Sequence, residues 1–385
     1  MKKIIMLFLM VFSLVLLSSC KKNLVLENET ISHETKFGGI YIHITIDDFN
    51  KIGFSYGDSL DISFSNGYEL LDLPYYNGYY TNTGEELMVG YPGYPYIKVC
   101  INNGNDIFYI AELEETDTAT IKLNKKEKYL DIQEALDIHY TDIQNGMSDE
   151  KFGNYRVVNV GNLKKDILYR SASPVDNEHN RAAVVDRLIN GKVNTIINLS
   201  DNDREILEHI NASDFNSPYA KSLYERNSII ALSMNMNFKT INGEDDSTPG
   251  LFVLFQEYTF QQKLIMGLRF ALENDGPYLI HCVEGKDRTG FVCMVFEALA
   301  GATYEEIVDD YMITYDNYYD INKKTNLVKY NIIKEKNIDE MLRTIINDDN
   351  VDIRTADYSY YIEQYLISKG MKEEEVHALK QKLTN

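Results

Sequence analysis

The residues best suited to chemistry lie in the stretch HCVEGKDRTG, at 281–290, which follows an apolar run. It places a thiol at Cys282 and a guanidinium at Arg288, with five residues between them. A cysteine is an effective nucleophile only as its thiolate, which a helix N-terminus and nearby cations favour. The apolar residues of 290–301 predict a helix directly after the stretch, so we expect both influences to act on Cys282.

The spacing between Cys282 and Arg288 is long enough for the chain to curl, so that its backbone N–H groups converge on one point. Converging amides at a helix N-terminus bind anions, and Gly285 removes a side chain that would obstruct the curl. The planar guanidinium of Arg288 can bind two oxygens of a phosphate at once. These residues therefore predict attack of the Cys282 thiolate on phosphorus, giving a cysteinyl-phosphate that water hydrolyses.

The same stretch resembles the signature loop of the protein tyrosine phosphatase superfamily, which is a cysteine, five residues and an arginine. Its ending, GKDRTG, resembles the atypical bacterial tyrosine and lipid phosphatases. Residues 161–174, GNLKKDILYRSASP, resemble the opening of that family's domain, and 195–202, TIINLSDN, its next strand and turn. The likeness spans roughly 145–385 and implies a phosphoric monoester hydrolase that needs no cofactor and no metal.

The resemblance also assigns roles within the stretch. It implies that Cys282 is the nucleophile, that Arg288 clamps the phosphate, and that His281 orients the loop and helps to favour the thiolate. The hydroxyl of Thr289 matches the position that assists the sulfur as it leaves during hydrolysis. The expected phosphate-binding residues are Val283, Glu284, Gly285, Lys286, Thr289 and Gly290.

The reaction also needs a group that protonates the leaving oxygen. Relatives usually supply an aspartate from a separate loop upstream of the cysteine, where this chain has NGEDDSTPG at 242–250, with Asp245 and Asp246. The atypical bacterial subgroup often lacks a clear match to that loop, which favours Asp287 inside the signature loop, and Asp201 is the third candidate. The alternative interpretation of GEDD is a solvated acidic loop.

The substrate class stays open at this stage. The resemblance implies phosphorylated proteins, on tyrosine or on serine and threonine, or phosphoinositides. A cation at Lys286 suits ligands with more than one phosphate, but the carboxylate of Glu284 would repel a second phosphate if it pointed into the pocket. Lys286 could instead pair with Asp287 or Glu284.

The elements that must position this loop follow from the pattern between 131 and 385, where apolar runs alternate with helical periods. Buried strands are predicted at 192–201, 228–238 and 276–282, and helices at 178–191, 251–274, 290–301 and along the C-terminal part. Strands that alternate with helices predict an α/β phosphatase domain, with a central, mostly parallel sheet flanked by helices.

The chain before residue 131 has a different character. Residues 20–35 are polar without a period, which predicts a tether, and 36–130 alternate in the manner of strands, as at Ile40, Ile42 and Ile44. We therefore expect a small all-β domain in front of the phosphatase domain. Its tyrosines could form a carbohydrate- or peptide-binding face or could simply pack the strands.

The first residues, MKKIIMLFLMVFSLVLLSSC, have the basic start, apolar run and small residues of an export signal. The apolar run is shorter than a membrane-spanning helix requires, which is the alternative interpretation. LSSC resembles the lipobox of bacterial lipoproteins, which implies removal of 1–19 and a lipid on Cys20. The resemblance places the protein at the outer face of a bacterial cell membrane.

Composition narrows the function further. A length of 385 residues favours more than one folded unit, and a net charge of -21 argues against nucleic-acid binding. If Cys20 carries lipid, Cys100, Cys282 and Cys293 remain, an odd number that gives no disulfide framework. We expect Cys100 and Cys293 to be buried, and the scattered histidines show no metal-ligand spacing. The sequence does not indicate an oligomeric state.

Two other functions use the same features. A rhodanese-like sulfurtransferase also has a cysteine in a loop of this size, but the GKDRTG ending weighs against it. A surface lipoprotein that binds phosphorylated partners without turnover is the second alternative, and it would show phosphate binding but no release.

Overall fold

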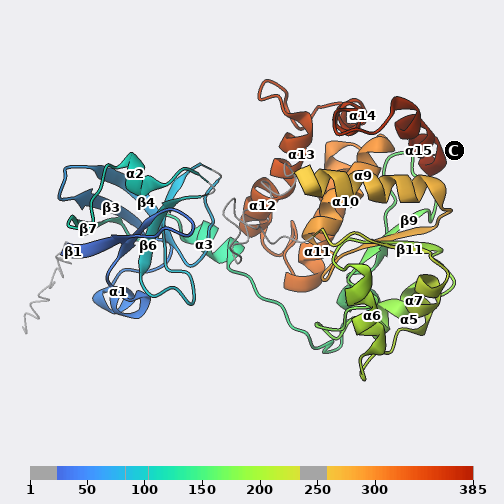
Figure 1. Ribbon diagram of the computed structural model, residues 1–385, viewed down its shortest axis with the longest axis horizontal. Helices are drawn as coiled ribbons and strands as arrows, with labels where there is room; N and C mark the ends of the chain where they lie inside the picture. The colour runs from blue at the N-terminus through green and yellow to red at the C-terminus, as the bar shows by residue number, and fades with distance from the viewer. Residues whose placement is uncertain (1–23, 83, 103, 235–257, 385) are drawn as a thin grey trace, which may run out of the picture.

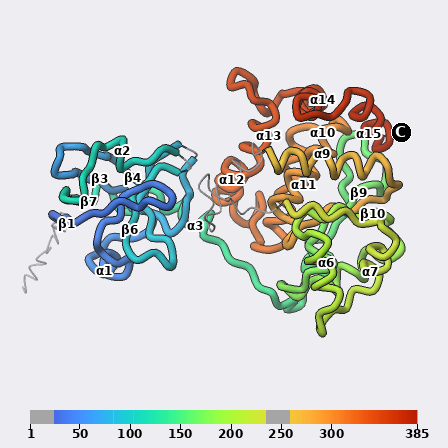
Figure 2. The backbone as a smooth tube through the Cα atoms, in the orientation of Figure 1, coloured from blue at the N-terminus to red at the C-terminus, as the bar shows by residue number. Residues whose placement is uncertain are grey.

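The computed structural model describes residues 24–82, 84–102, 104–234 and 258–384, which form two units (Figure 1). The first unit is a barrel followed by the helix α3 (Leu130–Leu136). The second is an α/β unit that begins at α4 (Asp149–Phe152), and its α12 (Leu327–Lys336) contacts α3. Figure 2 shows the connecting backbone, residues 137–148, leaving α3 and running to the α/β unit.

The barrel is closed by seven strands in the order β1-β2-β6-β5-β4-β3-β7. The strands are β1 (Val25–His33), β2 (Ile40–Ile42), β3 (Ser59–Phe64), β4 (Glu69–Tyr76), β5 (Glu86–Val89), β6 (Ile97–Ile101) and β7 (Thr118–Lys125). Neighbours are antiparallel except β4 and β5, which are parallel. Ile40 and Ile42 both enter the barrel core, because every second residue of a strand faces the same side.

The predicted tether at 20–35 is wrong over most of its described length, because Val25–His33 forms β1. This strand pairs with both β2 and β7 and so closes the barrel. Ile31 is its one buried side chain, and the others are exposed or half-buried. Ile31 belongs to the barrel core and Leu26 packs against it, but most of β1 is held by backbone hydrogen bonds, which explains why the sequence shows no period there.

The prediction of an all-β unit for 36–130 is also wrong in part. The unit contains two short helices, α1 (Ile46–Ile52) and α2 (Ile107–Ile110). The Thr45 hydroxyl accepts a hydrogen bond from the Asp48 N–H at 3.1 Å and caps α1. The residues from Ile46 onward therefore form a helix, although the apolar alternation of the preceding strand continues to that point. Cys100 lies buried on β6, as predicted.

The α/β unit contains the predicted central sheet, in the order β11-β10-β12-β9-β8. Its strands are β8 (Arg156–Val157), β9 (Leu168–Ser171), β10 (Thr195–Asn198), β11 (Ile229–Ala231) and β12 (Tyr278–His281). The four strands from β11 to β9 are parallel, and β8 is antiparallel to β9. Residues 235–238 of the strand predicted at 228–238 lie outside the described ranges.

Helices cover both faces of the sheet (Figure 1). Tyr278 and Ile280 of β12 pack into one core with α9 and α10, whereas Leu279 packs into the other with α5 and α7. The helices are α5 (Ala182–Ile189), α6 (Asp203–Asn211), α7 (Pro218–Glu225), α9 (Tyr258–Glu273), α10 (Asp287–Leu299), α11 (Tyr304–Tyr319), α13 (Ile338–Ile346), α14 (Tyr358–Ser368) and α15 (Glu373–Thr384). The α5, α9 and α10 helices lie where the sequence predicts helices, with 251–257 outside the described ranges.

Within the described ranges, no helix has the length and apolar character that crossing a bilayer requires. The predicted signal peptide, 1–19, and Cys20 lie outside those ranges.

Candidate active site

The signature loop, residues 282–288, connects the end of β12 to the first turn of α10. His281 lies opposite Asn198 of β10 and Ser171 of β9, so the loop leaves the sheet where three parallel strands end together. In open α/β sheets, ligands bind in the crevice outside these carboxyl ends. The predicted helix after the loop begins at Asp287 rather than at 290, so Arg288 lies in its first turn.

The loop curls at Gly285, whose φ angle is 70°. A Cβ atom at this position would lie 2.1 Å from the carbonyl oxygen of Ser171, the last residue of β9. A side chain would therefore both strain the backbone and collide with the sheet. The Val283 carbonyl accepts a hydrogen bond from the Ser173 N–H at 3.0 Å, which attaches the start of the loop to the same strand end.

The loop carbonyls are turned toward the surrounding scaffold. The Gly285 carbonyl accepts from Arg170 Nη2 and from Asn154 Nδ2, each at 3.1 Å. The Glu284 carbonyl accepts from the Tyr318 hydroxyl at 2.6 Å. Among the described residues, none of the backbone N–H groups of 283–288 donates a hydrogen bond. Paired carbonyls and unpaired amides in one curled loop form the anion cradle that the sequence predicts.

Arg170 is itself fixed by a buried ion pair. Its side chain is 1% exposed, and its Nη1 lies 2.6 Å from Asp310 Oδ2, while Arg156 Nε lies 2.8 Å from Asp310 Oδ1. Burial alone would raise the pKa of Asp310, but the two guanidinium groups lower it to about 2. Asp310 therefore stays ionised and holds Arg170 against the loop.

Arg170, Asn154, Tyr318 and Asp310 belong to the site but were not predicted from the sequence. Arg170 lies in the quoted stretch ILYRSASP, where it is the one cation of an apolar strand. A buried charge requires a partner, so this pattern was a usable indication of a structural ion pair. Asn154, Tyr318 and Asp310 had no such local indication, since their roles depend on contacts with residues far away along the chain.

The two predicted central residues lie at the two ends of the loop. Cys282 is buried, at 4% exposure, and the side chain of Arg288 is half-buried. Within the described part of the chain, the Arg288 guanidinium has no hydrogen-bond or ion-pair partner. Thr289 is fully buried, and its hydroxyl has no partner among the same residues. With no partner in the described ranges, the Arg288 guanidinium and the Thr289 hydroxyl are candidates to bind a ligand.

His281 is buried, and its Nδ1 lies 3.2 Å from the Cys282 carbonyl oxygen. Burial lowers the pKa of His281 to about 4. The imidazole is therefore neutral near pH 7, and its Nδ1–H donates to the carbonyl. The side chain can orient the loop as expected, but it supplies no positive charge to the thiolate.

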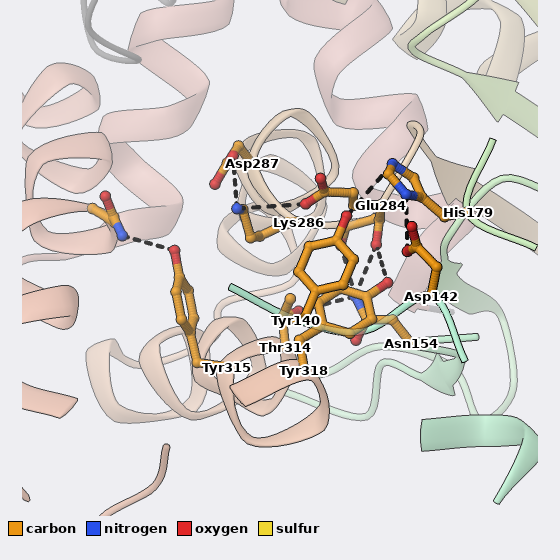
Figure 3. Close-up of polar contacts among 12 residues, drawn as sticks. Tyr140, Asp142, Asn154, His179, Glu284, Lys286, Asp287, Thr314, Tyr315 and Tyr318 are labelled. Carbon is orange, nitrogen blue, oxygen red and sulfur yellow. Dashed lines mark hydrogen bonds and ion pairs between the residues drawn. The ribbon is translucent and has the colours of Figure 1, made fainter. Parts of the chain in front are cut away.

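The cation of the loop, Lys286, lies between two carboxylates (Figure 3). Its Nζ is 3.5 Å from Glu284 Oε2 and 3.7 Å from Asp287 Oδ2. Burial alone would lower the pKa of Lys286, but Asp287, Tyr315 and Glu284 raise it well above its usual value. Lys286 thus remains charged and takes the pairing role that the sequence left open.

The candidates for the general acid differ in their surroundings. Asp287 accepts a hydrogen bond from the Tyr311 hydroxyl at 3.3 Å and belongs to the loop itself. Asp201 is buried and accepts hydrogen bonds from Asn198 and Ser200. Burial alone would raise the pKa of Asp201, but His209 and Asn198 lower it. An aspartate held in its ionised form is a poor proton donor. Asp245 and Asp246 lie outside the described ranges.

One group of described residues approaches the spacing of metal ligands. Ligand atoms of Asp176, Asp201 and His209 lie within 4.8 Å of one another. Asp201 is already engaged by the hydrogen bonds described above, and His209 Nε2 lies 3.6 Å from it. The group is accounted for as a hydrogen-bonded cluster beside the strand ends.

Comparison with known proteins shows which family has a matching sequence. The family model described as "Tyrosine phosphatase family" matches residues 151–385, which is more than half of the chain. This chain belongs to the tyrosine phosphatase family. The match includes the signature loop, Arg170 and Asp310, and it begins after the barrel and the connecting segment.

Two known proteins are similar to parts of this chain. A tyrosine-protein phosphatase from Nostoc commune is 32% identical over 91 residues, which is 24% of this chain and 31% of that protein. The chain thus aligns with about a third of that phosphatase. The core catalytic domain of PP-IP phosphatase SIW14 from S. cerevisiae, solved with citrate, covers 49% of this chain and 89% of that domain, at 20% identity and a TM-score of 0.24.

Proposed function

We propose that this tyrosine phosphatase family member hydrolyses phosphomonoesters through a cysteinyl-phosphate on Cys282. The observation that carries the proposal is the signature loop, whose carbonyls are paired and whose amides and Arg288 guanidinium have no partner among the described residues, beside the buried Cys282 thiol. Such a loop stabilises the negative charge on the phosphoryl group in the transition state, which is where a preorganised site contributes most.

In the first step, the thiolate sulfur of Cys282 forms a bond to phosphorus while the bond between phosphorus and the ester oxygen breaks. The leaving oxygen takes a proton, for which Asp287 is the favoured donor. Arg288 and the amides bind the remaining phosphoryl oxygens. In the second step, the oxygen of a water molecule bonds to phosphorus as the S–P bond breaks, and the water proton passes to the Asp287 carboxylate. The Thr289 hydroxyl stabilises the departing thiolate.

We propose phosphorylated proteins or phosphoinositides as substrates, because both carry phosphomonoesters that this mechanism can hydrolyse. The pairing of Lys286 with Glu284 and Asp287 weakens the argument for phosphoinositides with several phosphates. We further propose that the protein is exported and anchored by a lipid on Cys20 to the outer face of a bacterial cell membrane. The sequence of the first twenty residues supports this location. Loss of lipid labelling and of membrane association in Cys20→Ser tests it, and an unchanged membrane fraction would contradict it.

The function is tested by phosphate release from the purified protein under reducing conditions without added metal. A phosphotyrosine peptide, a phosphoserine peptide and a short-chain phosphoinositide serve as substrates, with Cys282→Ser as the control. We expect release that is lost in the variant. Binding of inorganic phosphate without release from any substrate would instead favour the phosphate-binding lipoprotein.

A further inference from the structure

The rim of the signature loop carries an acid whose position is fixed from two sides. The backbone carbonyl of Glu284 accepts the Tyr318 hydroxyl at 2.6 Å, and its carboxylate lies 3.5 Å from Lys286 Nζ. The Glu284 side chain is 27% exposed. Because main chain and side chain are both held, the carboxylate is part of the site rather than a free surface group (Figure 3).

The second support of Glu284 comes from outside the family match. Tyr140 lies in the segment between α3 and α4, and its ring stacks on Tyr318 with a centroid distance of 4.9 Å and an interplanar angle of 21°. Tyr318 in turn donates its hydroxyl to the Glu284 carbonyl, and the Tyr140 hydroxyl lies 3.5 Å from His179 Nε2. Arg181 lies over the same ring at 4.9 Å, so Tyr140 is held on several sides.

These contacts keep the Glu284 carboxylate ionised. Burial alone would raise the pKa of Glu284, but Lys286 and the Tyr140 hydroxyl hold it below its usual value. Burial and Glu284 also raise the pKa of Tyr140, so its hydroxyl keeps the proton that it donates. At the rim, Lys286 thus lies between the carboxylate of Glu284 and the carboxyl group of Asp287.

We propose that Glu284, positioned by Tyr140, is a specificity-determining residue that restricts the site to substrates with a single phosphate near the loop. A substrate with a second phosphate on the adjacent carbon would bring that group beside Lys286. There it would meet the Glu284 carboxylate, whose charge offsets the attraction of the lysine. The favoured substrates are then isolated phosphomonoesters such as phosphotyrosine, and inositol rings with vicinal phosphates are disfavoured. This inference rests on the phosphatase function proposed above.

The test compares one ring with one or two phosphates. Substrates are short-chain phosphatidylinositol 3-phosphate and phosphatidylinositol 3,4-bisphosphate, and the measured quantity is the ratio of their kcat/KM values. We expect Glu284→Gln to shift this ratio toward the bisphosphate by about tenfold and Tyr140→Phe by about threefold in the same direction. Glu115→Gln, which removes the same charge from an exposed site on the barrel, should leave the ratio unchanged.

A purely structural role of Tyr140 would lower both rates together and leave the ratio constant. An unchanged ratio in Glu284→Gln, with measurable rates on both substrates, would overturn the proposal. If the unmodified protein releases no phosphate, the proposed function fails by itself. The inference is then tested by calorimetry in the Cys282→Ser background, where Glu284→Gln must tighten binding of the bisphosphate relative to the monophosphate, and equal affinities would reject it.

Discussion

The barrel and the α/β unit each bury a cation against a carboxylate. In the barrel, Lys98 on β6 lies 2.6 Å from Glu34, which also accepts hydrogen bonds from the N–H groups of Lys36 and Phe37. That pair closes the turn between β1 and β2. In the α/β unit, Arg170 pairs with Asp310 and has N–H groups left over, which it donates to the carbonyl of Gly285.

The difference lies in what the fixed turn contains. The barrel turn carries no thiol, whereas the turn held by Arg170 carries Cys282, Arg288 and backbone amides that have no partner in the described part of the chain. The same device, a buried cation that fixes a turn, therefore serves stability in one unit and preorganises chemistry in the other. A planar guanidinium suits the second task, because it can bind a carboxylate and a carbonyl in fixed directions at once.

The largest effects are expected when the two buried cations, Arg170 and Lys98, are substituted in separate variants. Arg170→Met should destabilise the α/β unit by about 3–5 kcal/mol, because Asp310 loses one of its two partners in a buried site. It should also reduce kcat/KM by at least about 100-fold in the protein that remains folded, as a displaced cradle does. Lys98→Met should destabilise the barrel similarly, also by about 3–5 kcal/mol, and leave kcat/KM unchanged.

Urea unfolding followed by circular dichroism, together with phosphate release from the folded variants, measures both quantities. Equal loss of kcat/KM in the two variants would show that the barrel pair also supports catalysis.

The next largest effect is the pH dependence of the free energy of unfolding of the α/β unit, to which His281 contributes. The folded-state pKa of His281 is about 4, below its usual value of about 6.5, so the unfolded chain binds a proton in this window that the folded chain does not. As the pH falls from about 6.5 to 4, the free energy of unfolding should decrease by up to about 3 kcal/mol from this group. Below pH 4 the contribution is fully lost.

Urea titrations at several pH values, performed on the unmodified protein and on His281→Asn, isolate this contribution. The variant should lack this part of the slope, and parallel profiles for the two proteins would show that His281 is not the group that titrates.

The smallest effect sharpens the contrast between two turn carboxylates. Asp287→Asn should slow an alkyl phosphomonoester by about 100-fold but an aryl substrate with a good leaving group, such as p-nitrophenyl phosphate, by much less. Asp58 of the barrel is buried and accepts hydrogen bonds from Ser55 N and Glu127 N. Asp58→Asn should lower stability with no dependence of the rate on the leaving group. Equal losses of Asp287→Asn on both substrates would remove it as the general acid.

The predicted parts of the structure are those determined by neighbouring residues. The strand β12, the curled loop and the helix α10 follow one another along the chain, so apolar runs, Gly285 and the spacing of Cys282 and Arg288 were enough to predict them. The helix α1 was missed because the apolar alternation continues into it, and only the cap at Thr45 marks the change. The strand β1 was missed because closure of the barrel, not an apolar face, makes it a strand.

The residues that hold the signature loop in place could not be predicted from the sequence, for a different reason. Arg170 bonds Asp310 across 140 positions, and Tyr318 bonds Glu284 across 34. Each of these residues looks ordinary within its own helix or strand, and its role exists only when the sheet and α11 are packed together. Tyr140 is a stronger example, because it lies in a connecting segment with no regular period at all.

The most direct test of the central claim is to trap the covalent intermediate. The protein is mixed with a phosphotyrosine peptide, quenched rapidly in acid and digested, and the position of the bound phosphate is mapped by mass spectrometry. We expect phosphate on the peptide that contains Cys282, and none in Cys282→Ser. Turnover that persists in Cys282→Ser, or trapped phosphate on another residue, would contradict it.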